Sequence, residues 1–353
     1  MEYASLEQLV AARCLDTLSE YLDKNAEISV TQQKEIRALV RDIYSAIKTA
    51  PNLLFASLHE PDIYRNRYNK SSEGKSELYG LIKRIATAID NVIDSLLNIA
   101  KAAAVQEDGT FSVPTSIKIK KSHINIFDAV GISITKLKSG CTISPGIHSE
   151  AFEAISGLDI TPQQLTWGVF SEPEKSVASI YRRNLGDTEA FDTLIGYLRE
   201  NGYSCEVMRE GELNLDYSKD YGKNPTPLKV AWGERNHGGM SFTYHRDVEP
   251  AFVSALRIPA NKQLLAMADK MPESLRAFVV SRNTKCSGCR YCIQTDKTGT
   301  RPIIAINVEH AGKKYALCPN FPGFAFTFDK LDMTIVNNMI EYLHFIDENI
   351  SGL

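Results

Sequence analysis

Apolar residues in the first third of the chain recur at the three- and four-residue spacing of an α-helix. Ser5 and Ser29 each precede such a stripe and are followed three residues later by a glutamine, which is typical of a capped helix start. These patterns predict helices over residues 6–24, 30–50 and 78–99. The apolar positions that define them are Leu6, Leu9, Val10, Cys14, Leu18 and Leu22; Ile36, Leu39, Val40, Ile43 and Ile47; and Leu78, Leu81, Ile82, Ile85, Ile89, Val92, Ile93, Leu96 and Ile99.

The periodicity changes after residue 106. Residues 106–114 are polar and contain glycine and proline, so we interpret them as the boundary between a helical domain, residues 1–106, and an α+β domain, residues 112–353. Beyond the boundary, alternating apolar positions predict strands and longer periods predict helices. The expected strands are 117–119, 130–134, 203–207 and a hairpin of 228–232 with 240–245 that turns at 237–239; the expected helices begin at Asp187, lie within 250–281 and close the chain over 331–348.

Composition and charge narrow the class of protein. With 43% apolar residues, 24% charged residues and a net charge of −3, the chain has the composition of a globular protein. No run approaches the roughly 18 apolar residues of a membrane helix, and the first ten residues lack the basic and apolar parts of an export signal. We therefore expect no membrane partner and a cytoplasmic location, in which the seven cysteines stay reduced.

Four cysteines near the C-terminus form the strongest chemical signal. Cys286, Cys289 and Cys292 follow the pattern C-x-x-C-x-x-C, and Cys318 comes after a predicted hairpin over residues 303–317 that returns the chain. Four thiolates form the closed tetrahedral shell of a structural zinc site, and two-residue spacers direct successive sulfurs at one point. The sequence thus predicts an α+β fold class whose second domain contains a metal-binding lobe, residues 282–328, and a closing helix, residues 331–348.

The same cysteines allow a second metal. Three close cysteines and a remote Cys-Pro pair, here Cys318 and Pro319, resemble single-cluster ferredoxins that hold a [4Fe-4S] cluster. Arg290 and Tyr291 fill the second spacer, where those proteins carry small residues, so geometry favours Zn²⁺. The expected function is an interaction or small-molecule-binding role for a protein with a structural zinc, and an iron-sulfur redox protein is the alternative.

Two short motifs match enzyme families only locally. Residues 296–300 spell DKTGT, which resembles the phosphorylated aspartate motif of P-type ATPases, but no membrane spans accompany it and a polar loop is the favoured interpretation. Residues 74–76 resemble the end of a phosphate-binding P-loop, but Asn69 stands where its first glycine belongs, so a helix start is favoured. The chain contains no G-x-S-x-G nucleophile motif.

Other polar clusters are weaker signals. His237, His245, Asp247 and Glu249 lie close in sequence and are candidate acid-base groups or ligands, although solvated strand ends are the ordinary alternative. Basic residues gather in residues 281–320 and in residues 64–68, each with nearby tyrosines. Because the whole chain is slightly acidic, these runs do not favour nucleic-acid binding, and the partner, the process and the catalytic residues stay unassigned.

Overall fold

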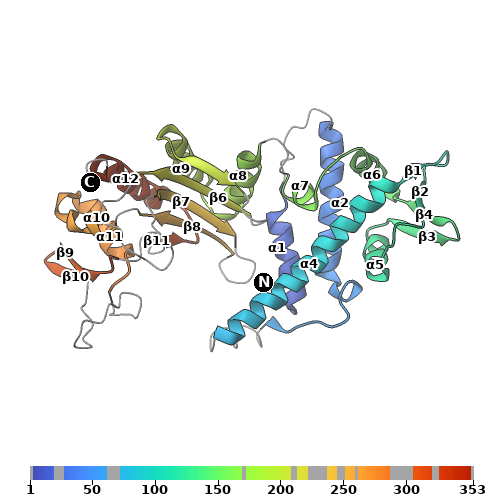
Figure 1. Cartoon of the computed structure of the whole chain (residues 1–353), viewed down its shortest axis with the longest axis horizontal. Coiled ribbons are helices and arrows are strands. Elements are labelled where there is room, and N and C mark those ends of the chain that lie inside the picture. The colour runs from blue at the N-terminus through green and yellow to red at the C-terminus, as the bar shows by residue number, and fades with distance from the viewer. Residues whose placement is uncertain are drawn as a thin grey trace. The chain divides into compact units, whose positions relative to one another are not determined.

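A computed structural model describes residues 3–19, 28–61, 72–168, 172–207, 213–221, 237–244, 251–258, 261–286, 305–319 and 326–350. The chain divides into two compact units. Unit 1 is Met1–Ile180 with Arg246–Ala251, and unit 2 is Tyr181–His245 with Phe252–Leu353. Both units mix helices with antiparallel sheets, which confirms the α+β class (Figure 1). Among the described residues, no helix is long and apolar enough to cross a bilayer.

Unit 1 begins with the helices that the apolar stripes predicted. Helix α1 spans Leu6–Thr17, α2 spans Val30–Thr49, and α4 spans Ser72–Ala102. The Ser29 hydroxyl accepts a hydrogen bond from the Gln32 amide, and the Gln32 side chain accepts one from the Ser29 amide, so the predicted capping box is confirmed. Helix α1 ends before the predicted residue 24, and residues 20–27 lie outside the described part of the chain.

A four-stranded antiparallel sheet follows, in the order β1-β2-β4-β3. Its elements are β1 (Ala104–Val105), β2 (Phe111–Pro114), α5 (Lys121–Ala129), β3 (Ser133–Leu137) and β4 (Gly140–Ser144). The Gln106 amide donates to the Thr110 carbonyl at 2.8 Å, so residues 106–110 of the predicted boundary form the turn between β1 and β2, and residues 111–114 form β2. Short elements complete the unit, namely η1 (Pro51–Leu53), η2 (Gly146–His148), α6 (Ser149–Ser156), α7 (Pro162–Trp167) and the start of α8 (Pro173–Asn184).

The strand predicted at residues 117–119 is wrong. Ile117 and Ile119 lie in the connection between β2 and α5, and both side chains are half-buried against the core of unit 1. Their alternation with lysines thus comes from a loop packed on the core. The strand predicted at residues 130–134 begins later, at Ser133.

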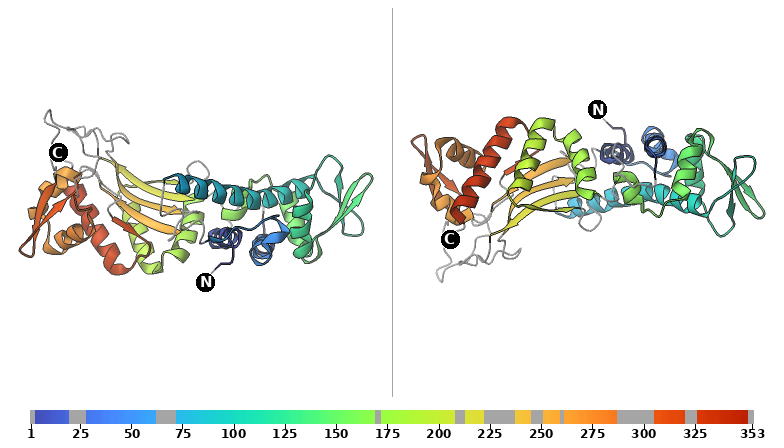
Figure 2. Two further views of the ribbon diagram at one scale, coloured as in Figure 1. Left: turned by 90° about the horizontal axis from the view of Figure 1, so that it is seen from below. Right: turned by 90° about the horizontal axis from the view of Figure 1, so that it is seen from above.

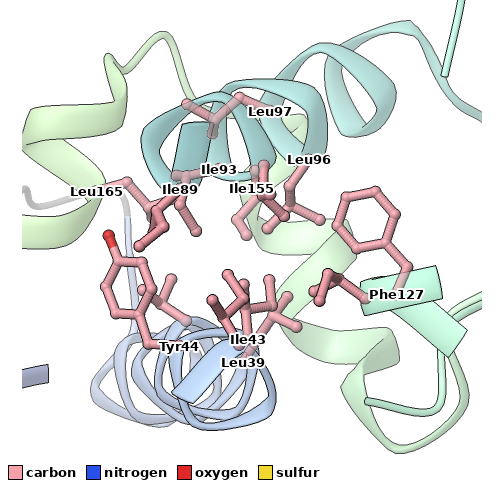
Figure 3. Packing of buried hydrophobic residues seen from close by; sticks show 14 of the residues in the cluster. Leu39, Ile43, Tyr44, Ile89, Ile93, Leu96, Leu97, Phe127, Ile155 and Leu165 are labelled. Atoms are coloured by element: carbon pink, nitrogen blue, oxygen red, sulfur yellow. The ribbon is translucent and has the colours of Figure 1, made fainter. Parts of the chain in front are cut away.

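The core of unit 1 is continuous across residue 106. Leu39 and Ile43 of α2 face Ile89 and Ile93 of α4, and Phe127 of α5 closes one side (Figure 3). The same cluster includes residues of β2, β4 and α6, all of which follow the predicted boundary. The boundary at residues 106–112 therefore falls inside unit 1, and independent folding of residues 112–353 stays a prediction.

Unit 2 is built on a five-stranded antiparallel sheet in the order β11-β8-β7-β6-β5. The strands are β5 (Ser204–Val207), β6 (Asn214–Asp220), β7 (His237–Tyr244), β8 (Phe252–Arg257) and β11 (Phe326–Phe328). One face is apolar and carries α9 (Thr188–Glu200) and α12 (Met333–Ile350), which Figure 2 shows on the same side. The Phe191 ring of α9 lies 5.3 Å from that of Phe242, and the Tyr342 ring of α12 lies 5.8 Å from that of Phe326.

The pairing of β7 corrects the predicted hairpin. Residues 237–239 belong to the strand, and β7 pairs with β6 on one side and β8 on the other. Gly239 has a φ of 144°, and a Cβ there would lie 2.0 Å from the Tyr217 carbonyl oxygen. The glycine therefore marks a close approach of two strands, where the sequence suggested a turn. The predicted partner strand, residues 228–232, lies outside the described residues.

The remaining elements of unit 2 are the helices that precede the predicted lobe and the two strands within it. They are α10 (Asn261–Ala266), η4 (Ala268–Lys270), α11 (Glu273–Arg282), β9 (Ile306–His310) and β10 (Lys313–Leu317). The helical prediction for residues 250–281 is wrong for β8 and right for α10 and α11. The closing helix predicted at residues 331–348 is confirmed as α12.

Candidate metal centre

The hairpin of β9 and β10 forms as predicted and returns the chain to the end of α11. Its strands pair from Lys313 opposite His310 to Leu317 opposite Ile306. Ala311 and Gly312 form the two-residue turn with φ values of 50° and 71°. Positive φ at both positions is the type I′ geometry that matches the twist of the flanking strands. The tight turn fixes the register, and the register fixes where Cys318 emerges.

Cys286 and Cys318 come together across a short ladder. Lys285 forms an antiparallel bridge with Leu317. The Cys286 amide donates to the Ala316 carbonyl at 2.9 Å, and the Cys318 amide donates to the Thr284 carbonyl at 2.8 Å. Residues on either side of a bridged pair point to the opposite face from that pair, so both cysteine side chains lie on one face of the ladder. They occupy diagonal positions, roughly 7–8 Å apart in a regular sheet, which is a distance that one metal ion can span.

The backbone of Cys318 is held on both sides. Its amide bonds to Thr284, and its carbonyl oxygen accepts a hydrogen bond from Asn261 Nδ2 at 3.0 Å. Cys318 and Asn261 are each 2% exposed. Cys286 is half-buried. The arrangement presents two thiols from a fixed frame, which is what a tetrahedral site requires of its ligands.

The other two predicted ligands are not described. Cys289 and Cys292, together with Arg290 and Tyr291, lie outside the described residues. Within the described ranges, no three His, Cys, Asp or Glu side chains lie close enough to hold a metal ion. Two of the four predicted ligands are thus adjacent, and the completion of the site stays a prediction.

The other sequence candidates fall elsewhere. The DKTGT motif at residues 296–300 lies outside the described residues, as do His245, Asp247 and Glu249. His237 is the first residue of β7. Residues 74–76 lie within α4, which agrees with a helix start and removes the loop that a phosphate site needs.

The three remaining cysteines lie on separate elements of the two units. Cys14 lies on α1, Cys141 on β4 and Cys205 on β5. Burial raises the pKa of the Cys141 thiol, and nearby Lys136 partly opposes this effect. A raised pKa favours the thiol over the metal-binding thiolate, so Cys141 is a poor ligand.

The sheet of unit 2 carries an ion pair, Arg257 with Asp216, that the sequence did not predict. Arg257 Nη1 of β8 lies 2.8 Å and 2.7 Å from the two carboxylate oxygens of Asp216 on β6. The pair crosses β7 near Gly239, which has no side chain to block it. It joins two strands that are not neighbours, and 41 residues separate the partners in sequence, so no local pattern could reveal it.

A tyrosine cluster ties α12 to the edge of the same sheet. The Tyr221 hydroxyl donates to Asp347 Oδ1 at 2.7 Å, and Lys219 Nζ lies 3.1 Å from the same oxygen. The Tyr203 hydroxyl lies 2.8 Å from that of Tyr221. Burial raises the pKa of both phenols, and Asp347 raises it further, while the hydrogen bond between the two phenols lowers the pKa of Tyr203 and raises that of Tyr221. Both phenols stay protonated at neutral pH, so the cluster holds the helix in place and does not supply a base.

No protein-family model matches the chain, and no curated protein or solved structure matches it either. Function therefore has to be inferred from the chemistry of the side chains and from their placement. The adjacent Cys286 and Cys318 are the described groups whose chemistry points most directly to a bound species.

Proposed function

We propose that Cys286, Cys289, Cys292 and Cys318 bind one zinc ion that folds the C-terminal lobe, residues 282–328. The observation that carries this proposal is the bridge between Lys285 and Leu317, whose flanking hydrogen bonds bring two of the four cysteines to one face. A C-x-x-C-x-x-C segment that starts at this bridge needs only a local turn to add two more thiolates.

The ion has a structural role in this proposal. Four thiolates close the coordination shell and leave no position for an activated water, so zinc acts here as a cross-link between the end of α11 and β10. The lobe then serves an interaction or small-molecule-binding role in a cytoplasmic protein.

An iron-sulfur redox protein is the second candidate. The favouring observation is the remote Cys318-Pro319 pair, placed beside Cys286 by the fold. A [4Fe-4S] cluster would need the same four thiolates, and the bulky Arg290 and Tyr291 of the second spacer oppose the close backbone approach that a cluster favours. The two candidates differ in metal content and in colour.

Metal analysis of the full chain, purified without oxygen and without added metal, tests the proposal. We expect one zinc per chain, no visible colour, and loss of the zinc in Cys318→Ser. Cys205→Ser, a change of the same chemistry on β5, should keep it. A brown protein that contains iron would establish the cluster instead. Metal-free protein, or full zinc in Cys318→Ser, would exclude both candidates.

A further inference from the structure

Lysines from two parts of the chain meet at one end of the sheet in unit 1. Pro114, the last residue of β2, pairs with Gly140 of β4, which pairs with Leu137 of β3. The connection from β2 to α5 and the turn from β3 to β4 therefore leave the sheet at the same end. The first carries Lys118 and Lys120 and leads into Lys121 of α5, and the second carries Lys138 and follows Lys136 of β3. We call these five residues the lysine end.

The lysine end is exposed and lacks compensating charge. All five lysines are exposed, and among the described residues none forms an ion pair with a carboxylate. Residues 111–149 contain these five lysines and a single acidic residue, Asp128. Asp128 lies at the other end of α5, so it does not neutralise the lysines. Although the whole chain carries a net charge of −3, this end of unit 1 is basic.

The charges on α5 run against the helix dipole. Lys120 is the N-cap residue and makes no side-chain cap hydrogen bond, and Lys121 opens the first turn. Asp128 lies in the last turn, where a cation is favourable. A helix stabilised by its own side chains alone would have the acidic residue in its first turn and the lysines in its last turn. An anion bound at the start of α5 would take the place of the missing cap side chain and would reduce the repulsion between the lysines.

We propose that the lysine end binds the phosphate backbone of a nucleic-acid duplex without base specificity. The turn with Lys136 and Lys138 and the start of α5 provide two groups of ammonium donors at one end, as phosphate contacts require. An anionic membrane fits less well, because Leu137, the last residue of β3, is the one exposed large apolar side chain next to the turn. The strongly exposed Val105 and Ile147 flank the opposite end of the sheet.

Fluorescence anisotropy with a short labelled DNA duplex and the full chain tests this proposal. Binding should weaken as salt rises from about 50 to 200 mM, with a log-log slope of up to about −0.9 for each phosphate contacted. The double variant Lys136→Gln/Lys138→Gln should bind at least five-fold more weakly at low salt, with a slope lower in magnitude by about two. Lys118→Gln, in the other group, should have about half that effect on the slope.

A matched control separates the lysine end from charge in general. Lys34→Gln/Lys83→Gln makes the same charge change at exposed positions on α2 and α4, and it should reduce affinity less than two-fold. An equal loss in this control would overturn the proposal, as would a wild-type chain that fails to bind the duplex at low salt. Binding to phosphatidylserine vesicles without binding to the duplex would assign the surface to a membrane and overturn it too.

Discussion

Arg37→Met should stabilise the protein, although it removes a hydrogen bond. Arg37 of α2 is 5% exposed, and its Nη1 donates to the Thr166 carbonyl at 3.0 Å. Its Nε and Nη2 are buried without a hydrogen-bond partner. Burial lowers the pKa of the guanidinium to about 9, and neighbouring Arg41 lowers it further while Tyr44 raises it. The charge is thus buried with little compensation, and such groups cost more than a well-packed apolar side chain.

The magnitude follows from the two opposing effects. A pKa lowered from 12.5 to about 9 corresponds to a penalty of about 5 kcal/mol on the charged form, at about 1.4 kcal/mol per pKa unit. The lost hydrogen bond is worth about 1–2 kcal/mol, and the Thr166 carbonyl keeps its bond from the Ser19 amide at 3.1 Å. Arg37→Met removes the penalty and loses the hydrogen bond, and methionine packed in the space of arginine realises part of the difference between the two. We therefore expect the free energy of unfolding to rise by about 1–3 kcal/mol.

Thermal melts of the full chain at pH 7 measure this gain. For a unit of this size, it should raise the melting temperature of unit 1 by about 2–10 °C, whereas Arg41→Met at an exposed position of the same helix should shift it little. Above pH 9 the folded state binds fewer protons than the unfolded state, so wild-type stability rises with pH and the advantage of Arg37→Met shrinks. A lower melting temperature for Arg37→Met would refute the reasoning and show that Arg37 has an anionic partner in solution.

Three further changes test the candidate site and the sheet. Asn261→Ala removes the donor to the Cys318 carbonyl and should weaken zinc binding by about 10-fold, measured by competition with a chelator. Ala311→Asn should raise the free energy of unfolding by about 0.5–1 kcal/mol in urea, because asparagine tolerates the positive φ of the turn. Gly239→Ala should cost about 3 kcal/mol or more in the same assay, since its Cβ would collide with the Tyr217 carbonyl.

Two control variants isolate these effects. Asn349→Ala removes a comparable bond, from Nδ2 to a backbone carbonyl within α12, and should leave zinc affinity unchanged. Gly196→Ala lies in α9 with open space around the new methyl group and should stabilise the protein by up to about 1 kcal/mol. Equal zinc loss in both asparagine variants, a Gly239→Ala chain as stable as Gly196→Ala, or a destabilised Ala311→Asn would contradict the corresponding prediction.

Elements defined by local signals could be predicted from the sequence. The capping box of Ser29 and Gln32, the stripe of α12 and the turn between β9 and β10 each depend on residues within a few positions of one another. Elements defined by distant partners could not. Strand β8 buries Phe252, Ser254 and Leu256 on one face. Because the middle residue of this series is a serine, the sequence lacks the regular apolar alternation that indicates a strand.

The same limit applies to the candidate site. The spacing of Cys286, Cys289 and Cys292 is local and visible, and the hairpin explains how Cys318 comes beside Cys286. Asn261 is the first residue of α10, and its hydrogen bond to Cys318 joins residues that are 57 positions apart. Nothing in the sequence of α10 indicates that the helix begins beside Cys318. Such supporting contacts are set by how helices and strands pack together, and a pattern in one segment does not encode that packing.

The lysine end shows how a wrong local assignment conceals a surface. The alternation of Ile117 and Ile119 with lysines suggested a strand, whose lysines would spread along one solvated face. In the structure the two isoleucines anchor a loop on the core, and the lysines gather at the start of α5. The pairing of Pro114 with Gly140 then adds the lysines of the next turn. The basic surface thus depends on the register of the sheet. The net charge of the whole chain does not reveal it, because acidic residues elsewhere in the chain offset these lysines in the sum.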